Sequence, residues 1–280
     1  MSTMIALLLV LSSLVGCAGE TLTNVKNALP APSAPTVSYH LEDNCYDESF
    51  IDEAGNTLAY CDYTVPRMTA LREDGAEVTE AATPAEEQAL AVVEAFNLRF
   101  ADWREDAPHI QEFLTQTPLE NGQAVVEELK CTAYQTGRLV SVSGEYQNYT
   151  GGTHSNTMLL SWNFDLDSGT FLEPDFLEED GTLKETVTAE LVRQAEETAL
   201  ENGLAPGEFF WEDYAEILED WTSYAVSFDE AGMTVGFSPY ELACYAAGPQ
   251  VFHVAYEKLS PHLGQHGREL LGLKGVEAAT

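Results

Sequence analysis

Two stretches of the 280-residue sequence bring together residue types that suit ligand recognition. The first, Tyr149-Thr-Gly-Gly-Thr-His-Ser155, places an imidazole after two glycines, whose permissive backbone allows a tight turn with free N–H and C=O groups. The second runs from Tyr240 to Pro249 and has one charged residue, Glu241. Its tyrosines offer a large contact area at a small entropic cost. We predict ligand contacts from Tyr149, Gly151, Gly152, His154, Ser155, Tyr240 and Tyr245.

Both stretches also have a purely structural interpretation, which the sequence leaves open. Gly151 and Gly152 suit any tight turn, and a lone histidine such as His154 is more often a hydrogen-bonded structural residue than a ligand. Tyr240 and Tyr245 could equally fill a core under a packed crossover loop.

Motifs for catalysis or metal binding are weak. Asp165-x-Asp167-x-Gly169 resembles the start of a calcium loop, but Phe176 stands where an EF-hand needs a bidentate Glu. His262 and His266 have a metal-like spacing, yet they lie in a polar stretch near the C-terminus. The sequence contains no G-x-S-x-G, no H-E-x-x-H and no Gly-rich phosphate loop. We therefore expect no catalytic residue, no metal and no cofactor.

The N-terminus predicts export. Met4 to Gly16 is an uncharged apolar run; it is shorter than the about 20 residues of a membrane span but has the length of a signal peptide's hydrophobic region. Leu14-Val15-Gly16-Cys17 resembles the lipobox of bacterial lipoproteins, which implies cleavage before Cys17 and lipidation of its thiol. A secretory signal in which Cys17 is incidental is the alternative. We expect residues 1–17 to be a signal, residues 18–35 a flexible linker, and the chain to be lipid-anchored at the cell surface, on the outer face of the cytoplasmic membrane.

The charge balance limits the possible partners. The sequence has 12 Lys and Arg against 47 Asp and Glu, a formal net charge of −35. Nucleic acid and anionic lipid surfaces require a basic face, so we exclude both as electrostatic partners. A strongly negative field can steer a cationic partner towards the protein.

Cysteine usage adds a prediction about disulfides. If Cys17 carries lipid, four cysteines remain in an oxidising compartment, an even number that allows three connectivities. Cys45 and Cys61 flank a turn cluster at residues 52–56, so we pair them with each other. Cys131 is then expected to pair with Cys244.

The predicted strands and helices that must position these residues come in runs and do not strictly alternate. This order indicates an α+β fold. We expect antiparallel sheets packed with helices, in two cooperating subdomains. Alternation of apolar and polar residues predicts strands over residues 37–47, 57–65, 123–134, 139–149, 157–165, 223–228, 233–237 and 251–256. Helical periodicity and capping signals predict helices over residues 83–103, 108–116, 182–202 and 210–221, with a last turn over 256–263.

Three motifs carry a family resemblance: residues 149–155, residues 163–176 beginning Asn163-Phe-Asp-Leu-Asp-Ser-Gly-Thr170, and residues 237–248 around Ser238-Pro-Tyr240. Their order and spacing are similar to the extracytoplasmic region of lysozyme-binding anti-sigma-V-type factors. The resemblance implies an N-terminal domain of the kind found beside peptidoglycan deacetylases, at 36–145, an anti-sigma-factor-type domain of unknown function at 146–263, and a loose tail at 264–280. The sequence departs from the pattern at Cys244, where the family has Pro.

The resemblance implies a sensory or ligand-binding protein whose best-known relative binds lysozyme, a cationic enzyme. Because we find neither an anti-sigma domain nor a deacetylase catalytic domain in the sequence, we expect a non-catalytic extracytoplasmic ligand-binding lipoprotein. Its expected partner is an extracellular protein or cell-wall ligand, with lysozyme as the leading candidate. The alternatives are a glycan-modifying enzyme or accessory protein of the cell wall, which would gather Asp165, Asp167, His154 and His262 in one cleft, and a structural envelope protein.

Overall fold

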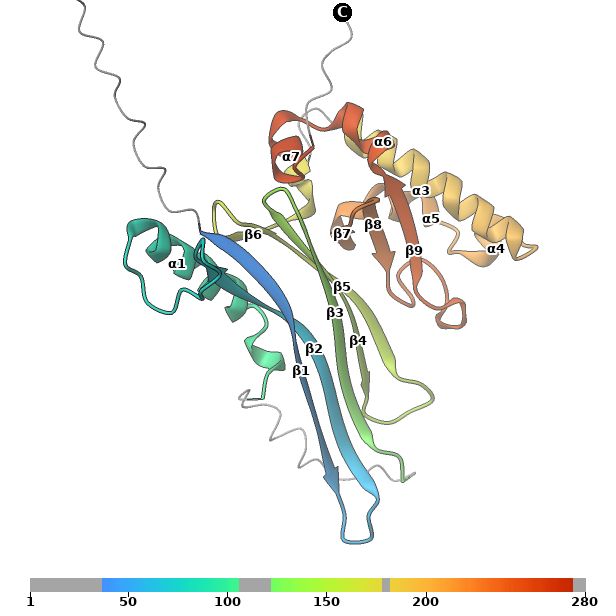
Figure 1. The fold of residues 1–280 in the computed structure, drawn as a ribbon. Helices are drawn as coiled ribbons and strands as arrows, with labels where there is room; N and C mark the ends of the chain where they lie inside the picture. Colours follow the sequence, from blue (N-terminus) through green and yellow to red (C-terminus); the bar gives the residue numbers. More distant parts are fainter. Residues whose placement is uncertain (1–36, 106–121, 178–181, 274–280) are drawn as a thin grey trace, which may run out of the picture. The chain divides into compact units, whose positions relative to one another are not determined.

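A computed structural model describes residues 37–105, 122–177 and 182–273, shown in colour in Figure 1. All of these residues lie in one compact unit, Pro35–Thr280. It has the expected α+β architecture, with a six-stranded sheet of order β1-β2-β3-β4-β5-β6 and a three-stranded antiparallel sheet of order β7-β8-β9. We call them the large sheet and the small sheet.

Five of the six strands of the large sheet lie where the sequence pattern predicts strands. Its strands are β1 (Ser38–Ile51), β2 (Thr57–Leu71), β3 (Val125–Thr136), β4 (Leu139–Tyr149), β5 (Asn156–Asp165) and the short β6 (Thr170–Leu172). Four of the five pairings are antiparallel, but β2 and β3 run parallel. A parallel pair requires a long crossover connection, and the stretch between β2 and β3 contains the helix α1 (Pro84–Leu98).

Helix α1 begins as its sequence predicts. The Thr83 hydroxyl accepts a hydrogen bond from the Glu86 N–H, and Pro84 is the first helical residue. The helix ends at Leu98, earlier than expected, and the short turn η1 (Ala101–Trp103) follows. Phe96 and Phe100, fully buried, pack on the large sheet. Each buried apolar side chain of this size contributes about 1.5–3 kcal/mol.

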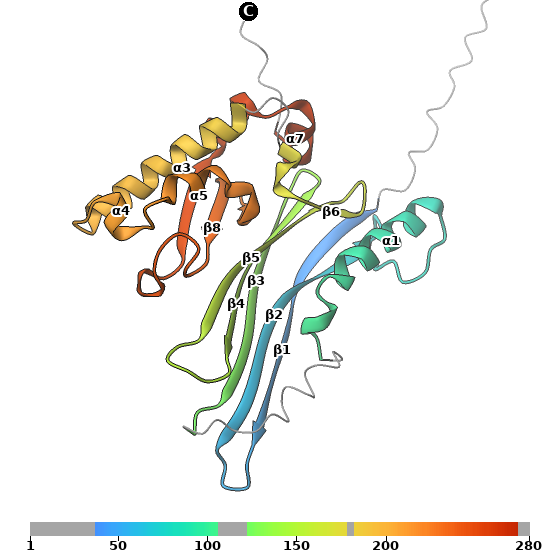
Figure 2. The ribbon, with the colours of Figure 1, turned by 180° about the vertical axis from the view of Figure 1, so that it is seen from behind.

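The small sheet consists of β7 (Ala225–Phe228), β8 (Gly232–Phe237) and β9 (Gln250–Ala255). The long helix α3 (Thr182–Glu201) packs beside β9, where the Gln194 carboxamide donates to the His253 carbonyl (2.7 Å) and accepts from the His253 N–H (3.2 Å). Gly203, with φ 74°, ends the helix as expected. Figures 1 and 2 show α1 beside β1 and β2, and the small sheet with α3 beyond β5.

Short helices complete the described part of the chain. They are η2 (Pro174–Leu177), α4 (Pro206–Phe209), α5 (Tyr214–Glu219), η3 (Trp221–Ser223), η4 (Tyr245–Ala247), α6 (Tyr256–Leu259), η5 (Ser260–His262) and α7 (Gln265–Leu270). Two large hydrophobic cores result, one between α1 and the large sheet and one around α3 and the small sheet. Among the described residues no helix is both long and apolar enough to cross a membrane.

The structure corrects two predictions about where helices lie, one for residues 210–221 and one for residues 264–280. The helix predicted over 210–221 is reduced to α5, because Phe210 instead forms an isolated β-bridge with Ala243. The expected loose tail contains α7, and its backbone binds the large sheet: the Arg138 N–H donates to the Leu270 carbonyl (3.1 Å) and the Thr136 hydroxyl to the Leu271 carbonyl (2.7 Å). Burial of Leu270 and Leu271 in the second core explains why this stretch folds.

Both predicted disulfides are corrected, because Cys45, Cys61, Cys131 and Cys244 are free. A β-bulge at Phe50/Ile51 shifts the β1–β2 register, so Cys45 lies opposite Thr64 while Cys61 lies opposite Glu48. This offset puts the two thiols on opposite faces of the sheet, Cys45 exposed and Cys61 buried. Cys131 is buried in the first core, whereas Cys244 is exposed.

Several expectations concern residues outside those described. They include the signal peptide with Cys17, the linker over 18–35, and the helix over 108–116. The domain boundary expected between residues 145 and 146 falls inside β4, which runs without a break from Leu139 to Tyr149.

Candidate functional site

The two predicted loops meet in the structure. The Tyr245 hydroxyl, in the β8–β9 loop, donates a hydrogen bond to the Ser155 carbonyl (2.8 Å), just before β5. The His154 ring stacks on Tyr245, with ring centroids 3.6 Å apart and an interplanar angle of 17°. Tyr240 lies beside both rings, 5.7 Å from Tyr245 and 6.5 Å from His154 between centroids. Residues far apart in sequence thus form one cluster.

A fourth aromatic residue, Trp211, joins the cluster. Its indole N–H donates to the Tyr240 carbonyl (3.1 Å), and the Trp211 N–H donates to the Leu242 carbonyl (3.1 Å). We call His154, Trp211, Tyr240 and Tyr245 the aromatic patch. Tyr240 is 59% exposed and Trp211 37% exposed. The patch therefore presents ring surface to solvent while its polar atoms hold the loops in place.

The β4–β5 turn owes its shape to its glycines. Gly151 and Gly152 have φ angles of 108° and 112°, a backbone region that disfavours other residues. The Tyr149 hydroxyl donates to the Gly152 carbonyl (3.0 Å) and also contacts Gln123. Tyr149 therefore supports the start of the turn, while His154, close to the start of β5, is exposed and stacks on Tyr245.

Tyr240 has a strained backbone. Its φ of 74° makes it the one non-glycine residue at positive φ in the described part of the chain. A bulky residue in this region is an outlier that costs on the order of 1–3 kcal/mol. The conformation is held by hydrogen bonds from the Tyr240 N–H to the Ala243 carbonyl and from the Glu241 N–H to the Ser238 carbonyl, both 3.0 Å. Strain that the fold maintains around an exposed ring points to a functional role.

Sequence reasoning missed Trp211. In the helix predicted over residues 210–221, Phe210 and Tyr214 are four residues apart and share one apolar face, whereas Trp211 lies off that face. A large aromatic residue on the polar face of a predicted amphipathic segment is a usable signal for an exposed contact residue. Its neighbours Glu212 and Asp213 are exposed, as is Glu241 beside Tyr240. Negative charge therefore borders the patch on both sides.

A second contact joins the small sheet to the large one. The free edge of β7 lies on the polar face of β4 and β5, where the Phe228 N–H donates to the Ser141 hydroxyl and the Val226 N–H to the Ser161 hydroxyl, each at 2.8 Å. The Asn163 carboxamide donates to the Val226 carbonyl (2.9 Å) and accepts from the Ser141 hydroxyl (2.9 Å). We call Ser141, Ser161 and Asn163 the polar clamp. The side chains of the polar clamp thus provide hydrogen-bond partners for backbone N–H and C=O groups of the edge strand β7.

The residues of the catalytic alternative do not form one site. Asp165 and Asp167 are engaged by Arg138, with nitrogen–oxygen distances of 3.0 Å to each carboxylate. His154 lies just before the opposite end of β5, and His262 approaches Thr182 (3.4 Å). In the described ranges no group of three or more His, Cys, Asp or Glu side chains could hold a metal ion.

Comparisons with known proteins found one matching family model and several similar solved structures. Residues 172–257 match a family described as a protein of unknown function, DUF3298. Among solved structures, the chain is similar to a DUF3298 family protein from Pseudomonas aeruginosa PAO1, with 16% identity and a TM-score of 0.50 over 82% of this chain and 96% of that chain. A member from Bacteroides fragilis is also similar, with 18% identity and a TM-score of 0.46 over 83% and 96% of the two chains.

No curated protein matches the sequence. At 16% identity, the likeness to the P. aeruginosa protein extends to the fold alone. The matched region contains the small sheet, α3 and three of the four patch residues, while His154 lies outside it. Residues 172–257 of this chain therefore form a DUF3298 domain, a domain of unknown function.

Proposed function

We propose that this chain is a non-catalytic, extracytoplasmic binding module that contacts its ligand through the aromatic patch. The observation that carries the proposal is Tyr240, a large ring that is 59% exposed on a strained backbone. A residue whose only role was packing would be buried, and an ordinary loop residue would relax to negative φ. Exposed Tyr and Trp side chains gathered in one cluster are typical of binding hot spots.

The proposed ligand is a cationic protein, with lysozyme as the first candidate. The net charge of −35 supports steering of a basic partner, and Glu212, Asp213 and Glu241 border the patch. The rings of Trp211, Tyr240 and Tyr245 could also receive Lys or Arg side chains, because a cation is attracted to the negative face of an aromatic ring.

The proposal includes the anchor inferred from the lipobox-like residues before Cys17. A lipid on Cys17 and a proline-rich spacer over 29–35 would hold the binding surface away from the membrane. The ligand would then be met outside the cell. Metabolic labelling with a palmitate analogue, compared between the natural chain and Cys17→Ser, tests the anchor separately from binding.

Titration of the full chain with lysozyme at about 20 mM and about 150 mM NaCl tests the ligand. We expect binding that weakens as salt rises, and Tyr240→Ala should weaken it at least about tenfold. Phe50→Ala is the matched control, because Phe50 is 42% exposed but lies at the end of β1, away from the patch. Absence of binding at both salt concentrations would exclude lysozyme, and equal effects of the two variants would exclude the patch.

A further inference from the structure

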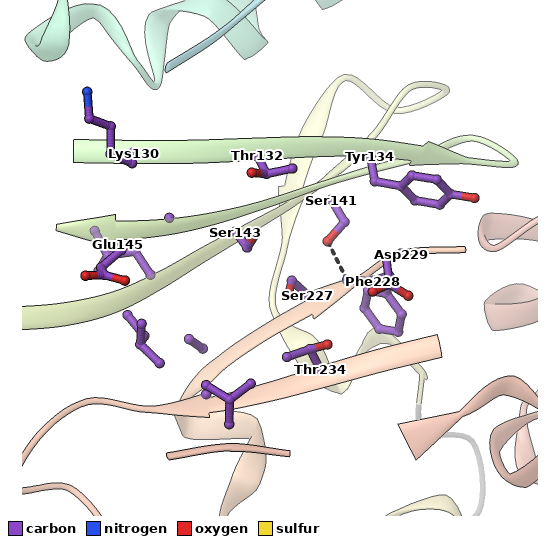
Figure 3. Close-up of a pocket in the computed structure, with 16 residues that line it drawn as sticks. Lys130, Thr132, Tyr134, Ser141, Ser143, Glu145, Ser227, Phe228, Asp229 and Thr234 are labelled. Atoms are coloured by element: carbon purple, nitrogen blue, oxygen red, sulfur yellow. Dashed lines mark hydrogen bonds between the residues drawn. The ribbon is translucent and has the colours of Figure 1, made fainter. Parts of the chain in front are cut away.

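A cleft separates the polar face of the large sheet from the outer face of the small sheet (Figure 3). Its volume is about 400 Å³, within the size range of small-molecule sites. One wall comes from β3, β4 and β5, and the other from β7, β8 and β9. The polar clamp ties β7 to β4 and β5 beside the cleft, so the spacing of the walls is set by the fold.

Hydroxyl groups without partners line both walls. Thr132 and Ser143 belong to the large sheet, and Ser227 and Thr234 to the small sheet. Across the described residues, none of these four side chains has a hydrogen-bond partner, whereas Ser141 in the clamp uses its hydroxyl both as donor and as acceptor. Each free hydroxyl can donate one hydrogen bond and accept others.

The charged side chains at the cleft are already engaged. Lys130 forms an ion pair with Asp62, and Glu145 accepts a hydrogen bond from Gln147. The Asp229 carboxylate caps its own turn by accepting from the N–H groups of Ala231 and Gly232. The groups that the cleft leaves free for a ligand are therefore hydroxyls on both walls, with apolar surface from Leu159 and from Val251, which is 58% exposed. Glu145 and Asp229 remain negatively charged, because their hydrogen-bond donors are uncharged amide groups.

We propose that this cleft is a second ligand site, and that it takes a neutral sugar of one or two rings. A sugar offers hydroxyl donors and acceptors on its edges and C–H groups on its faces, and each wall of the cleft carries both free hydroxyls and apolar surface. An anionic ligand would meet no unpaired cation among the described lining residues, and the acidic chain would repel it.

An extended peptide fits less well. Peptides that bind to sheets usually add a strand to a free edge through main-chain hydrogen bonds. The cleft walls present the side-chain faces of strands, and the β7 edge beside it is occupied by the clamp. No cleft residue belongs to the aromatic patch, so this site is independent of the proposed protein-binding function.

The experiment titrates the full chain, labelled with nitrogen-15, with glucose, N-acetylglucosamine and maltose, and with glucose 6-phosphate as the charged comparison. We expect at least one neutral sugar to shift the amide signals of Thr132, Ser143, Ser227 and Thr234, and the phosphate ester to bind at least about tenfold more weakly. Absence of saturable shifts with all three neutral sugars, or equal binding of the phosphate ester, would overturn the proposal.

Variants locate the site. Thr132→Phe and Ser143→Phe fill the cleft from exposed positions and should each weaken sugar binding at least about tenfold. Thr57→Phe, at the exposed start of β2 outside the cleft, is the matched control and should leave sugar binding unchanged. Tyr240→Ala in the aromatic patch should also leave sugar binding unchanged. Unchanged binding by both cleft variants, or loss with Tyr240→Ala, would place the sugar elsewhere and contradict the proposal.

Discussion

Two of the places where the small sheet meets the large sheet differ in burial. At the polar clamp, Ser141 and Asn163 are 1% and 2% exposed, and their hydrogen bonds pair the backbone of an edge strand. At the aromatic patch, a hydrogen bond from Tyr245 to Ser155 joins the loops, and the rings of Trp211 and Tyr240 remain exposed. The difference separates two roles, since buried polar pairs support the fold, whereas exposed rings are available for recognition.

The clamp should give the largest effect on stability. In Asn163→Leu the Val226 carbonyl loses its donor and the Ser141 hydroxyl its acceptor, and both groups stay buried. We expect the free energy of unfolding to fall by about 2–4 kcal/mol. Urea unfolding measures it, with Asn156→Leu, at the exposed end of β5, as a control expected to cost less than about 1 kcal/mol. Equal losses would mean that the clamp has no special role.

A second buried polar group gives a smaller effect that depends on pH. Glu190 lies on α3, and hydrogen bonds from Arg193, then Lys258 and Gln194, lower the pKa of its carboxyl to about 2 despite its burial. Because this folded-state pKa lies below the ordinary value of 4.5, the stabilisation is present above pH 4.5 and is lost as pH falls towards 2.

We expect Glu190→Gln to cost about 1–2 kcal/mol at pH 7 and to lose most of that difference near pH 2. Unfolding measured across this range tests the prediction. A difference between the two chains that stayed constant with pH would show that Glu190 contributes through packing alone.

The patch should respond in the opposite way to the clamp. Tyr240→Gly removes the ring but relieves the positive φ of 74°, so we expect the free energy of unfolding to stay within about 0.5 kcal/mol or to rise, while ligand binding weakens. Thermal or urea unfolding alongside the lysozyme titration measures both quantities. A loss of more than about 1 kcal/mol would make Tyr240 a structural residue and remove the contrast with the clamp.

The smallest effect concerns the thiol of Cys45, which lies in neither contact. Cys45→Ser should change stability by less than about 0.5 kcal/mol, because Cys45 is exposed and forms no disulfide, and a serine hydroxyl can keep the contact with the Thr64 hydroxyl. In the native chain Cys45 and Cys244 should react quickly with a thiol reagent. Cys61 and Cys131 should react slowly, because burial raises the pKa of both thiols, that of Cys131 to about 12. A mass spectrum with disulfide-linked peptides would contradict the four free thiols.

Local signals made much of the fold predictable from the sequence. Alternating strands, the Thr83-Pro84 helix start and the glycine turns depend on neighbouring residues, and they were confirmed. Register could not be predicted in the same way, because the bulge at Phe50/Ile51 moved Cys45 away from Cys61. The α7 segment was missed because its burial depends on contacts with Thr136 and Arg138, far away in sequence.

In the candidate site, too, the features that depend on neighbouring residues could be predicted, and those that depend on tertiary contacts could not. Each loop could be recognised from its own residues, and the structure brings His154 next to Tyr245. The clamp residue Asn163 was noticed within a motif, but its role became clear only with β7 against β5. The free hydroxyls gather in one cleft because the two sheets face each other there, and no local sequence pattern predicts that arrangement.

Hydrogen–deuterium exchange of the full chain, with and without lysozyme, tests the patch as the recognition surface most directly. We expect slower exchange over residues 150–155 and 239–248 when lysozyme is bound, with residues 225–228 beside the clamp unchanged. Protection confined to segments away from these two loops, with lysozyme bound, would contradict the aromatic patch as the binding surface.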